Sequence, residues 1–147
     1  MHESNVAKIG LFALAAFGFV AILGIALTSG TDIEGEDWVV EELVIDAAAV
    51  PPLPGTELSA FFDGGELSGA AGCNTYFAGY RLDGSSIAIG PAGSTMAFCS
   101  APEGIMEQEF AYLTLLGAAD SFSVDGNRLT LSSGDDVLLR FAIGDAE

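Results

Sequence analysis

The pattern of hydrophobic and polar positions differs between two parts of this chain. Residues 9–28 form one continuous apolar run, IGLFALAAFGFVAILGIALT, whereas the sequence after it alternates over short distances. About 20 apolar residues match the roughly 30 Å hydrocarbon core of a bilayer, and a buried soluble helix of that length would need a polar edge. The run therefore predicts a transmembrane helix over residues 9–29, preceded by a cytoplasmic tail at residues 1–8.

The flanks of the apolar run predict its orientation. Lys8 and the amino terminus precede it, and the acidic stretch GTDIEGED at residues 30–37 follows it. Basic flanks stay in the cytoplasm, so we expect the rest of the chain on the outer side of the cytoplasmic membrane, with residues 30–37 as a linker. The run is longer than a signal-peptide core of about 7–15 residues and ends in a poor cleavage site. An uncleaved single-pass anchor is expected, with secretion after signal cleavage as the alternative.

Residues 38–143 show the period of two that is typical of half-buried strands. Pro51, Pro52 and Pro54 deny backbone donors to a sheet, so residues 47–55 are predicted to be a loop. Strands are predicted at residues 38–46, 57–63, 66–70, 76–82 and 86–89, and three more from residue 122 onward, joined by Asp-Gly and Ser-Gly turns.

One helix is predicted between these two groups of strands. Ser100 and Glu103 have the spacing of a capping box, and Glu103, Glu107 and Glu109 lie where the helix dipole favours negative charge. One face of this helix carries Met106, Phe110, Leu113 and Gly117. The order of elements predicts an α+β domain that is mainly antiparallel β, a sheet or cracked small barrel with one packed helix.

Charge and missing residue types exclude several classes of function. The net charge is −17, and the only basic side chains beyond the apolar run are Arg81, Arg128 and Arg140, which excludes nucleic-acid binding. His2 and Lys8 are the only histidine and lysine, so the exported part lacks a Ser-His or Cys-His pair and a P-loop lysine. We expect no enzyme, no cofactor and no metal site. The acidity either keeps the domain hydrated or attracts cationic partners.

Three motifs stand in order within this domain. They are Gly72-Cys73-Asn74 followed by Gly79-Tyr80, then Thr95 with Cys99, then Glu107 with Phe110. In this order they resemble the META domain family, the family of the heat-inducible protein HslJ, over residues 38–143. The resemblance implies a small cracked β-barrel with a helix and an association with envelope stress, without an assigned activity. Met96-Ala97-Phe98 stands where the family usually has Arg-Met-Ala, so no role of that arginine carries over.

The two cysteines and the asparagine beside them are the first candidate site. An even cysteine count in an exported domain predicts a disulfide between Cys73 and Cys99, which would contribute about 3 kcal/mol by closing a loop of about 25 residues. Two separate buried thiols and a reactive redox pair are the alternatives. Asn74 lies in a glycine-rich corner, where we expect it to hold a turn rather than a ligand.

The aromatic residues of the central strands are expected to form core. Phe61 and Phe77 fall out of phase with their inward-pointing neighbours, so they are the candidates for an exposed apolar surface that binds a peptide or a lipid chain. We therefore expect a non-catalytic envelope module that acts in stress or binds a protein or an apolar ligand. The alternatives are a carboxylate-based hydrolase of an envelope polymer, built on Glu103, Glu107 or Glu109, and a carrier with an internal cavity.

Overall fold

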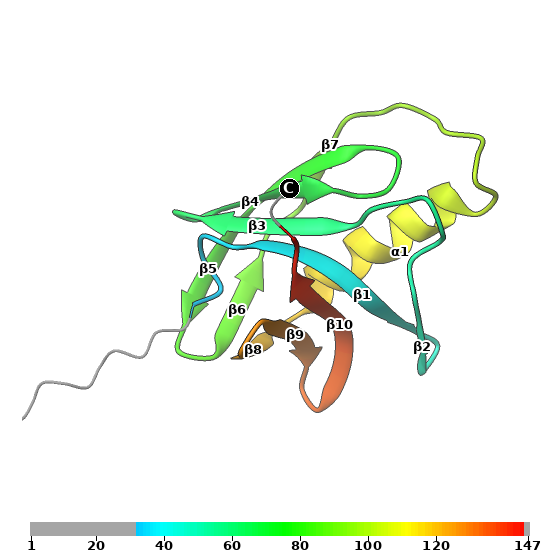
Figure 1. The fold of residues 1–147 in the computed structure, drawn as a ribbon. Coiled ribbons are helices and arrows are strands. Elements are labelled where there is room, and N and C mark those ends of the chain that lie inside the picture. The colour runs from blue at the N-terminus through cyan, green and yellow to red at the C-terminus, as the bar shows by residue number, and fades with distance from the viewer. Residues whose placement is uncertain (1–31, 146–147) are drawn as a thin grey trace, which may run out of the picture. The chain divides into compact units, whose positions relative to one another are not determined.

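The computed structural model describes residues 32–145, so the predicted tail and the predicted transmembrane helix at residues 9–29 lie outside the described residues. The described part contains ten strands and one helix (Figure 1). These are β1 Asp37–Ile45, β2 Ala48–Val50, β3 Ser59–Asp63, β4 Glu66–Ala70, β5 Thr75–Asp83, β6 Ser86–Ile89, β7 Gly93–Ser94, α1 Ile105–Ala118, β8 Ser121–Asp125, β9 Arg128–Ser133 and β10 Asp136–Ile143. Within residues 32–145, no helix is long and apolar enough to cross a membrane.

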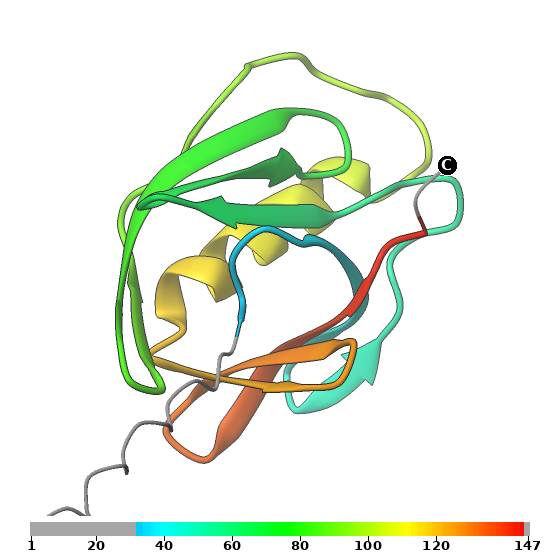
Figure 2. The same ribbon diagram turned by 60° about the vertical axis from the view of Figure 1, so that its left-hand side comes forward.

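The strands form one antiparallel sheet that closes on itself. Its order is β10-β9-β8-β6-β5-β4-β3-β1-β2, β7 pairs with β5, and β1 also pairs with β10. This last pairing runs from Trp38 opposite Ile143 to Leu43 opposite Leu139 and joins the two ends of the sheet. Figure 2 shows the barrel that results. Closure removes most of the free strand edges, and the predicted antiparallel fold with one helix is confirmed.

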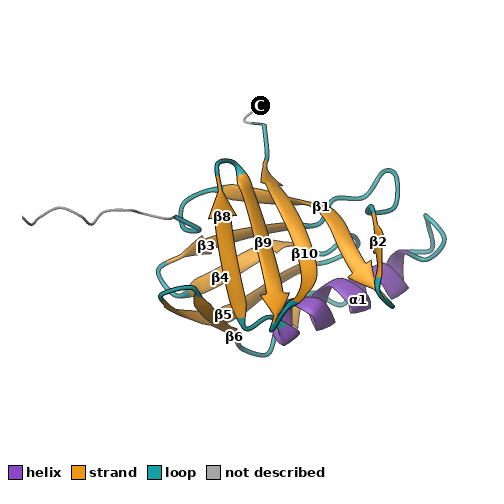
Figure 3. Ribbon diagram, turned by 90° about the horizontal axis from the view of Figure 1, so that it is seen from below, coloured by secondary structure: helices purple, strands orange, loops and turns teal. Residues whose placement is uncertain are grey.

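The barrel has one weak seam, between β6 and β8. Among the described residues a single pair, Ser86 opposite Ser121, joins these two strands. Helix α1 packs against β6, β9 and β10 and so spans this seam. Figure 3 shows α1 lying along one side of the barrel.

Inward-pointing side chains that alternate along the strands fill the interior, and the alternation is clearest on β5. On β5 the side chains of Tyr76, Ala78 and Tyr80 are buried, whereas Phe77 between them is exposed, as its phase predicts. Phe61 is half-buried. The largest fully buried side chains are Trp38, Tyr112, Phe62 and Phe141. Burial of each such side chain stabilises the fold by on the order of 2–3 kcal/mol.

The segment after β1 departs from the prediction of a loop over residues 47–55. Residues 48–50 form β2 against the end of β1, with Val50 opposite Leu43 and Ala48 opposite Ile45. The prolines begin only at Pro51, so the three preceding residues keep the backbone donors that pairing requires. The loop is therefore limited to the proline-containing part.

The start of α1 also differs from the prediction. The helix begins at Ile105 after Gly104, which has a φ of 88° and caps the helix without any side-chain hydrogen bond. Ser100 and Glu103 precede this start, so they form no capping box. A left-handed glycine turns the chain into the helix instead, a conformation that costs glycine little.

The described part of the predicted linker packs onto the barrel. Ile33 is fully buried in the core, and Gly35 donates its backbone N–H to the carbonyl of Phe62 at 3.0 Å. The Trp38 indole in turn donates to the carbonyl of Ile33 at 2.9 Å. An apolar residue within an acidic stretch is the signal that the domain begins before residue 38.

Candidate functional site

Asn74 is the centre of a buried hydrogen-bond network between the start of β5 and the β7–α1 loop, residues 95–104. Its Oδ1 accepts hydrogen bonds from Thr95 Oγ1 at 2.9 Å and from the Ala97 backbone nitrogen at 2.8 Å. Its Nδ2 donates to the Ala97 carbonyl at 3.1 Å. The asparagine side chain thus replaces strand pairing and holds the loop against the barrel.

Glu109 holds the same corner from α1. Its Oε1 accepts from the backbone nitrogens of Cys73 at 3.2 Å and Asn74 at 2.9 Å, and its Oε2 accepts from Asn74 Nδ2 at 2.7 Å. The side chain is buried and forms no ion pair with any described residue. Three N–H donors are what makes burial of this carboxylate tolerable. We call Cys73, Asn74, Thr95, Ala97 and Glu109 the Asn74 network.

A disulfide adds a covalent tie at this corner. Cys73 and Cys99 are bonded, with their Cα atoms 5.9 Å apart and a sequence separation of 26. The structure thus contains the disulfide that the sequence predicted, and no described cysteine is free. The bond joins the start of β5 to the β7–α1 loop, two residues beyond the last hydrogen bond of the Asn74 network.

The motif residues on α1, Glu107 and Phe110, both lie on the exposed side of the helix. Glu107 is exposed, and Phe110 is one of the most exposed aromatic residues. Glu109 and Tyr112 have the same spacing and are both buried. The buried face of α1 consists of Ile105, Gln108, Glu109, Tyr112 and Leu116 rather than the face predicted from Met106, Phe110, Leu113 and Gly117. Because two of its members are polar, apolar periodicity could not find this face.

Gln108 is a second buried polar residue of α1 that sequence reasoning missed. Its Oε1 accepts from the Leu53 backbone nitrogen at 2.6 Å, and its Nε2 donates to Thr56 Oγ1 at 3.1 Å. It fastens the proline-containing loop to the helix. Gly72 lies beside it with a φ of 103°, and a Cβ at Gly72 would be 3.4 Å from Gln108 Nε2.

Tyr76 and Tyr112 lie beneath this corner as a buried pair. Their rings meet edge to face with centroids 5.7 Å apart, and their hydroxyl oxygens are 3.0 Å apart. Both hydroxyls also lie 2.8 Å from the Ser59 carbonyl. Burial raises the pKa of both phenols above the ordinary value, so they stay neutral and act as structural donors.

Gly79 and Tyr80 lie away from the Asn74 network, further along β5. Tyr80 donates its hydroxyl proton to the Glu34 carboxylate, and its ring packs edge to face on Phe62 at 5.1 Å. Burial of Tyr80, together with the hydrogen bond to Glu34, raises its pKa to about 12. The motif therefore divides into two groups: Gly72, Cys73, Asn74, Thr95 and Cys99 come together, whereas Gly79 and Tyr80 fasten the other end of the barrel.

Large apolar side chains flank the Asn74 network on the solvent side. Met96 is 93% exposed, Phe98 79%, Phe110 74% and Phe77 65%, the four highest values among the large hydrophobic residues of the described chain. Each lies within three residues of a member of the network. The ring of Phe77 covers Gly93, where a Cβ would be 2.6 Å from the Phe77 Cζ. We call Phe77, Met96, Phe98 and Phe110 the apolar patch.

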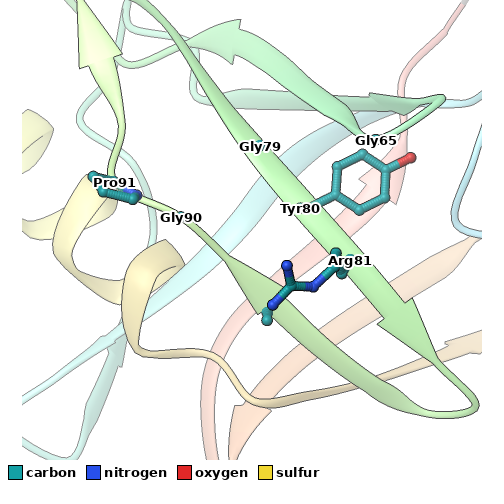
Figure 4. Close-up of a pocket in the computed structure, with 7 residues that line it drawn as sticks. Gly65, Gly79, Tyr80, Arg81, Gly90 and Pro91 are labelled. Atoms are coloured by element: carbon teal, nitrogen blue, oxygen red, sulfur yellow. The ribbon is translucent and has the colours of Figure 1, made fainter.

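A groove of about 430 Å³ lies on the outer side of β5 (Figure 4). Arg81 reaches into it, whereas Tyr80 points to the other side of the strand. Among the arginines of residues 32–145, Arg81 forms no ion pair, unlike Arg128 and Arg140. The groove is lined by Gly65, Gly79, Tyr80, Arg81, Ala88, Gly90 and Pro91. Its floor is glycine backbone, which offers no acid, base or nucleophile.

Glu103 and Glu107 both line a cleft of about 220 Å³ beside the first turn of α1. Both carboxylates are exposed, and no described residue forms an ion pair or hydrogen bond with either. Catalytic carboxylates need packing and hydrogen bonds that fix their position. The pair therefore has the geometry of surface acids. Within residues 32–145, no cluster of three or more His, Cys, Asp or Glu side chains could hold a metal ion.

Comparison with known proteins gives a family match that extends over the whole described domain. The family model of the META domain matches residues 31–144. Solved structures that are similar include a protein from Burkholderia xenovorans (NMR; 22% identity, TM-score 0.62, 86% of this chain and all of that one) and a DUF4847 family protein from Bacteroides vulgatus (crystal; 16% identity, TM-score 0.52, 76% of this chain and 94% of that one). At these identities the likeness concerns the fold. No curated protein matches the sequence.

Proposed function

The chain belongs to the META domain family, and we propose that it is a membrane-anchored extracytoplasmic module that binds a protein partner through the apolar patch, without catalysis. One observation carries the proposal: the four most exposed large apolar side chains all lie within three residues of the Asn74 network. The anchor itself is proposed from the apolar run at residues 9–28. The association with envelope stress that the family resemblance implies remains part of this proposal.

A firmly held apolar surface is suited to binding. The Asn74 network and the Cys73–Cys99 disulfide fix the backbone from which Met96 and Phe98 project. A loop that is ordered beforehand loses little conformational entropy when a partner docks. Exposed apolar side chains that are concentrated rather than scattered favour an interaction site. The polar residues of the corner therefore support recognition by shaping the loop.

The place where the chain enters the domain also supports a partner in the aqueous phase. The network holds Thr75 at the start of β5, whereas Glu34 is bonded to Tyr80, five residues further along. Five residues of strand span about 17 Å. In Figure 1 the blue start of the described chain lies near the end where β5 meets β6, far from the loop between β7 and α1. The described chain thus enters the domain at the end of β5 that lies away from the apolar patch.

The two alternatives receive less support from the geometry. A hydrolase of an envelope polymer would rely on Glu103 and Glu107, which share a cleft but are exposed and have no positioning partner among the described residues. A carrier would need an internal cavity of roughly 300 Å³ or more, whereas large side chains such as Trp38 and Phe141 fill the barrel interior.

Site-specific photocrosslinking tests the proposal. A photoreactive amino acid replaces Met96 in the full chain, and cells are irradiated. We expect one discrete adduct, because this side chain is the most exposed large apolar residue. The same probe at Leu82, an exposed apolar residue of β5 near the β5–β6 turn, serves as the matched control and should give no such adduct.

The adduct must also depend on the patch. Phe98→Ser together with Phe110→Ser, combined with the probe at Met96, is expected to remove it without lowering the amount of the protein in membranes. Equal crosslinking from Met96 and Leu82, or an adduct that survives the double substitution, would overturn the proposal. Intact-mass measurement of the protein extracted from membranes tests the anchor, because cleavage would remove the apolar run at residues 9–28.

A further inference from the structure

The first turn of α1 lies between two hollows that share Gly104 and Glu107. The hollow on the side of the β7–α1 loop has a volume of about 220 Å³ and is the cleft described above. The hollow on the other side has about 360 Å³ and lies between the end of β1, β2 and α1. It is lined by Leu43, Ile45, Val50, Pro51, Leu53, Gly104, Glu107, Gln108 and Ala111.

The sizes of the two hollows favour successive side chains over one compact ligand. Pockets for drug-sized molecules have volumes of about 300–1,000 Å³, and the first hollow lies below this range while the second lies near its lower limit. Their walls are mainly apolar, with Phe98, Pro102 and Met106 on one side and Leu43, Val50 and Leu53 on the other. An extended or helical peptide that crosses the first turn would place one apolar side chain in each hollow.

We call Glu103 and Glu107 the ridge: Glu107 lines both hollows, Glu103 lines only the first, and neither carboxylate is compensated. Glu103 and Glu107 are four residues apart, and no described residue pairs with either carboxylate. The basic residues of the described chain are three arginines; Arg128 and Arg140 pair with Glu41 and Glu42, and Arg81 lines the groove on β5. The residues that the structure describes therefore supply no cation to this ridge.

The helix dipole and the two carboxylates have opposite signs, so their relative sizes determine which charge the ridge attracts. The amino end of a helix carries about half a positive charge, which by itself favours an anion. Two full carboxylates that line the same hollow outweigh it, and the net charge of −17 adds to the same sign. An anionic peptide or an anionic lipid surface is repelled here, whereas a cation is attracted.

We propose, resting on the proposed function above, that the partner is a protein segment in which a lysine or arginine is flanked by apolar residues. Its cation lies over Glu103 and Glu107, and its apolar neighbours enter the two hollows. Phe98 belongs both to the apolar patch and to the first hollow, so the patch and the hollow form one docking surface. Within this surface the charge of the ridge determines specificity.

A peptide titration on the full chain tests this inference. The chain is reconstituted in nanodiscs of zwitterionic lipid, with empty nanodiscs as the blank. The probe is a fluorescent decapeptide with a central lysine between two leucines; matched peptides carry norleucine or glutamate in place of the lysine. We expect the lysine peptide to bind about tenfold more tightly than the norleucine peptide, the glutamate peptide to bind more weakly still, and added salt to reduce the difference.

Substitutions separate the charge from the apolar contacts. Glu103→Gln with Glu107→Gln is expected to weaken the lysine peptide about tenfold and to leave the norleucine peptide unchanged. Glu66→Gln, a charge change of the same kind on exposed β4, should leave both unchanged. Phe98→Ser should weaken both peptides. We expect these variants to fold, because the changed side chains are exposed. The emission of Trp38 checks this.

Each of three results would overturn the inference while leaving the proposed function standing. One is equal affinity for the three peptides with loss of binding in Phe98→Ser, which would indicate an uncharged apolar partner. Another is unchanged affinity of the lysine peptide in the double glutamine variant. Failure of every peptide to bind, combined with a specific crosslink at Met96, would also reject this partner class. Failure of both the peptides and the crosslink would reject the proposed function as well.

Discussion

The two sides of the β7–α1 loop differ in burial and in whether their polar groups have hydrogen-bond partners. On the inner side, Asn74 and Glu109 are buried, and their side chains hydrogen-bond to the loop or to the start of β5. On the outer side, Met96 and Phe98 are exposed, and Glu103 has no partner among the described residues. The residues that stabilise the corner and the residues proposed to bind a partner therefore lie on opposite sides of one loop. Inner substitutions should change the free energy of unfolding, and outer ones should change only binding.

Replacing Glu109 is expected to have the largest effect. In Glu109→Ala the backbone N–H groups of Cys73 and Asn74 and the Asn74 amide lose their acceptor in a buried place. We expect the free energy of unfolding to fall by about 3–4 kcal/mol. Urea denaturation of the full chain in a non-ionic detergent measures it, followed by the emission of Trp38, which is the single tryptophan and is fully buried.

Glu107→Ala is the matched control for this prediction. Glu107 lies on the same helix two residues earlier, but its side chain is exposed and has no partner among the described residues. Its removal should change the free energy of unfolding by less than about 0.5 kcal/mol. Similar losses in the two variants would mean that the inner network does not stabilise the corner.

Removal of the disulfide is expected to have the next effect. Cys73→Ala with Cys99→Ala opens a loop with a sequence separation of 26. The entropy of the unfolded chain then increases, which should lower the free energy of unfolding by about 3 kcal/mol. Denaturation midpoints of the oxidised chain and of the double variant give the difference. Alkylation of the wild-type chain under denaturing, non-reducing conditions should label neither cysteine, and labelling of both would contradict the bond.

The sequence predicted the parts of the fold that depend on alternation and turns. The inward set of β5, with Tyr76 and Tyr80 inside and Phe77 outside, follows directly from the period of two. The hairpin glycines Gly84 and Gly126 have positive φ values, 62° and 64°, as Asp-Gly turns require. These features are local, so a single sequence contains enough information to place them.

The candidate site was harder to predict because its key contacts are non-local and polar. Glu109 is 35 residues from Asn74 in the chain, and in the sequence nothing distinguishes it from the exposed Glu107. A rule that places every polar residue in solvent is correct for Glu107 and wrong for Glu109. Only the position of the buried Tyr112, three residues after Glu109, would have indicated the correct register.

A smaller effect is expected at the other end of β5, where Tyr80 should make the free energy of unfolding depend on pH. The pKa of Tyr80 is raised to about 12 in the folded state from an ordinary value near 10. A raised pKa of this kind means that the stabilisation is complete below about pH 10 and is lost as the pH rises through about 12. Tyr80→Phe should lower the free energy of unfolding at neutral pH by about 1 kcal/mol, through the lost bond to Glu34.

The pH dependence distinguishes this bond from a packing effect. Denaturation of the wild type and of Tyr80→Phe between about pH 8 and pH 12 should show a steeper decline of stability in the wild type. Glu34→Gln, which keeps an acceptor but removes the charge, should lie between the two. Parallel curves for the wild type and Tyr80→Phe would show that Tyr80 does not contribute to the alkaline loss, which would then be assigned to the buried pair Tyr76 and Tyr112.

The smallest change in stability is expected on the outer side of the loop. Met96→Ser and Phe98→Ser replace side chains that are 93% and 79% exposed, so each should change the free energy of unfolding by less than about 0.5 kcal/mol. Phe98→Ser is also expected to weaken peptide binding, and together with Phe110→Ser it should remove the adduct formed by the probe at Met96. Denaturation and binding are measured on the same preparations. A loss of stability comparable to that of Glu109→Ala would show that Met96 and Phe98 pack in the folded state, and the separation between the two sides of the loop would then fail.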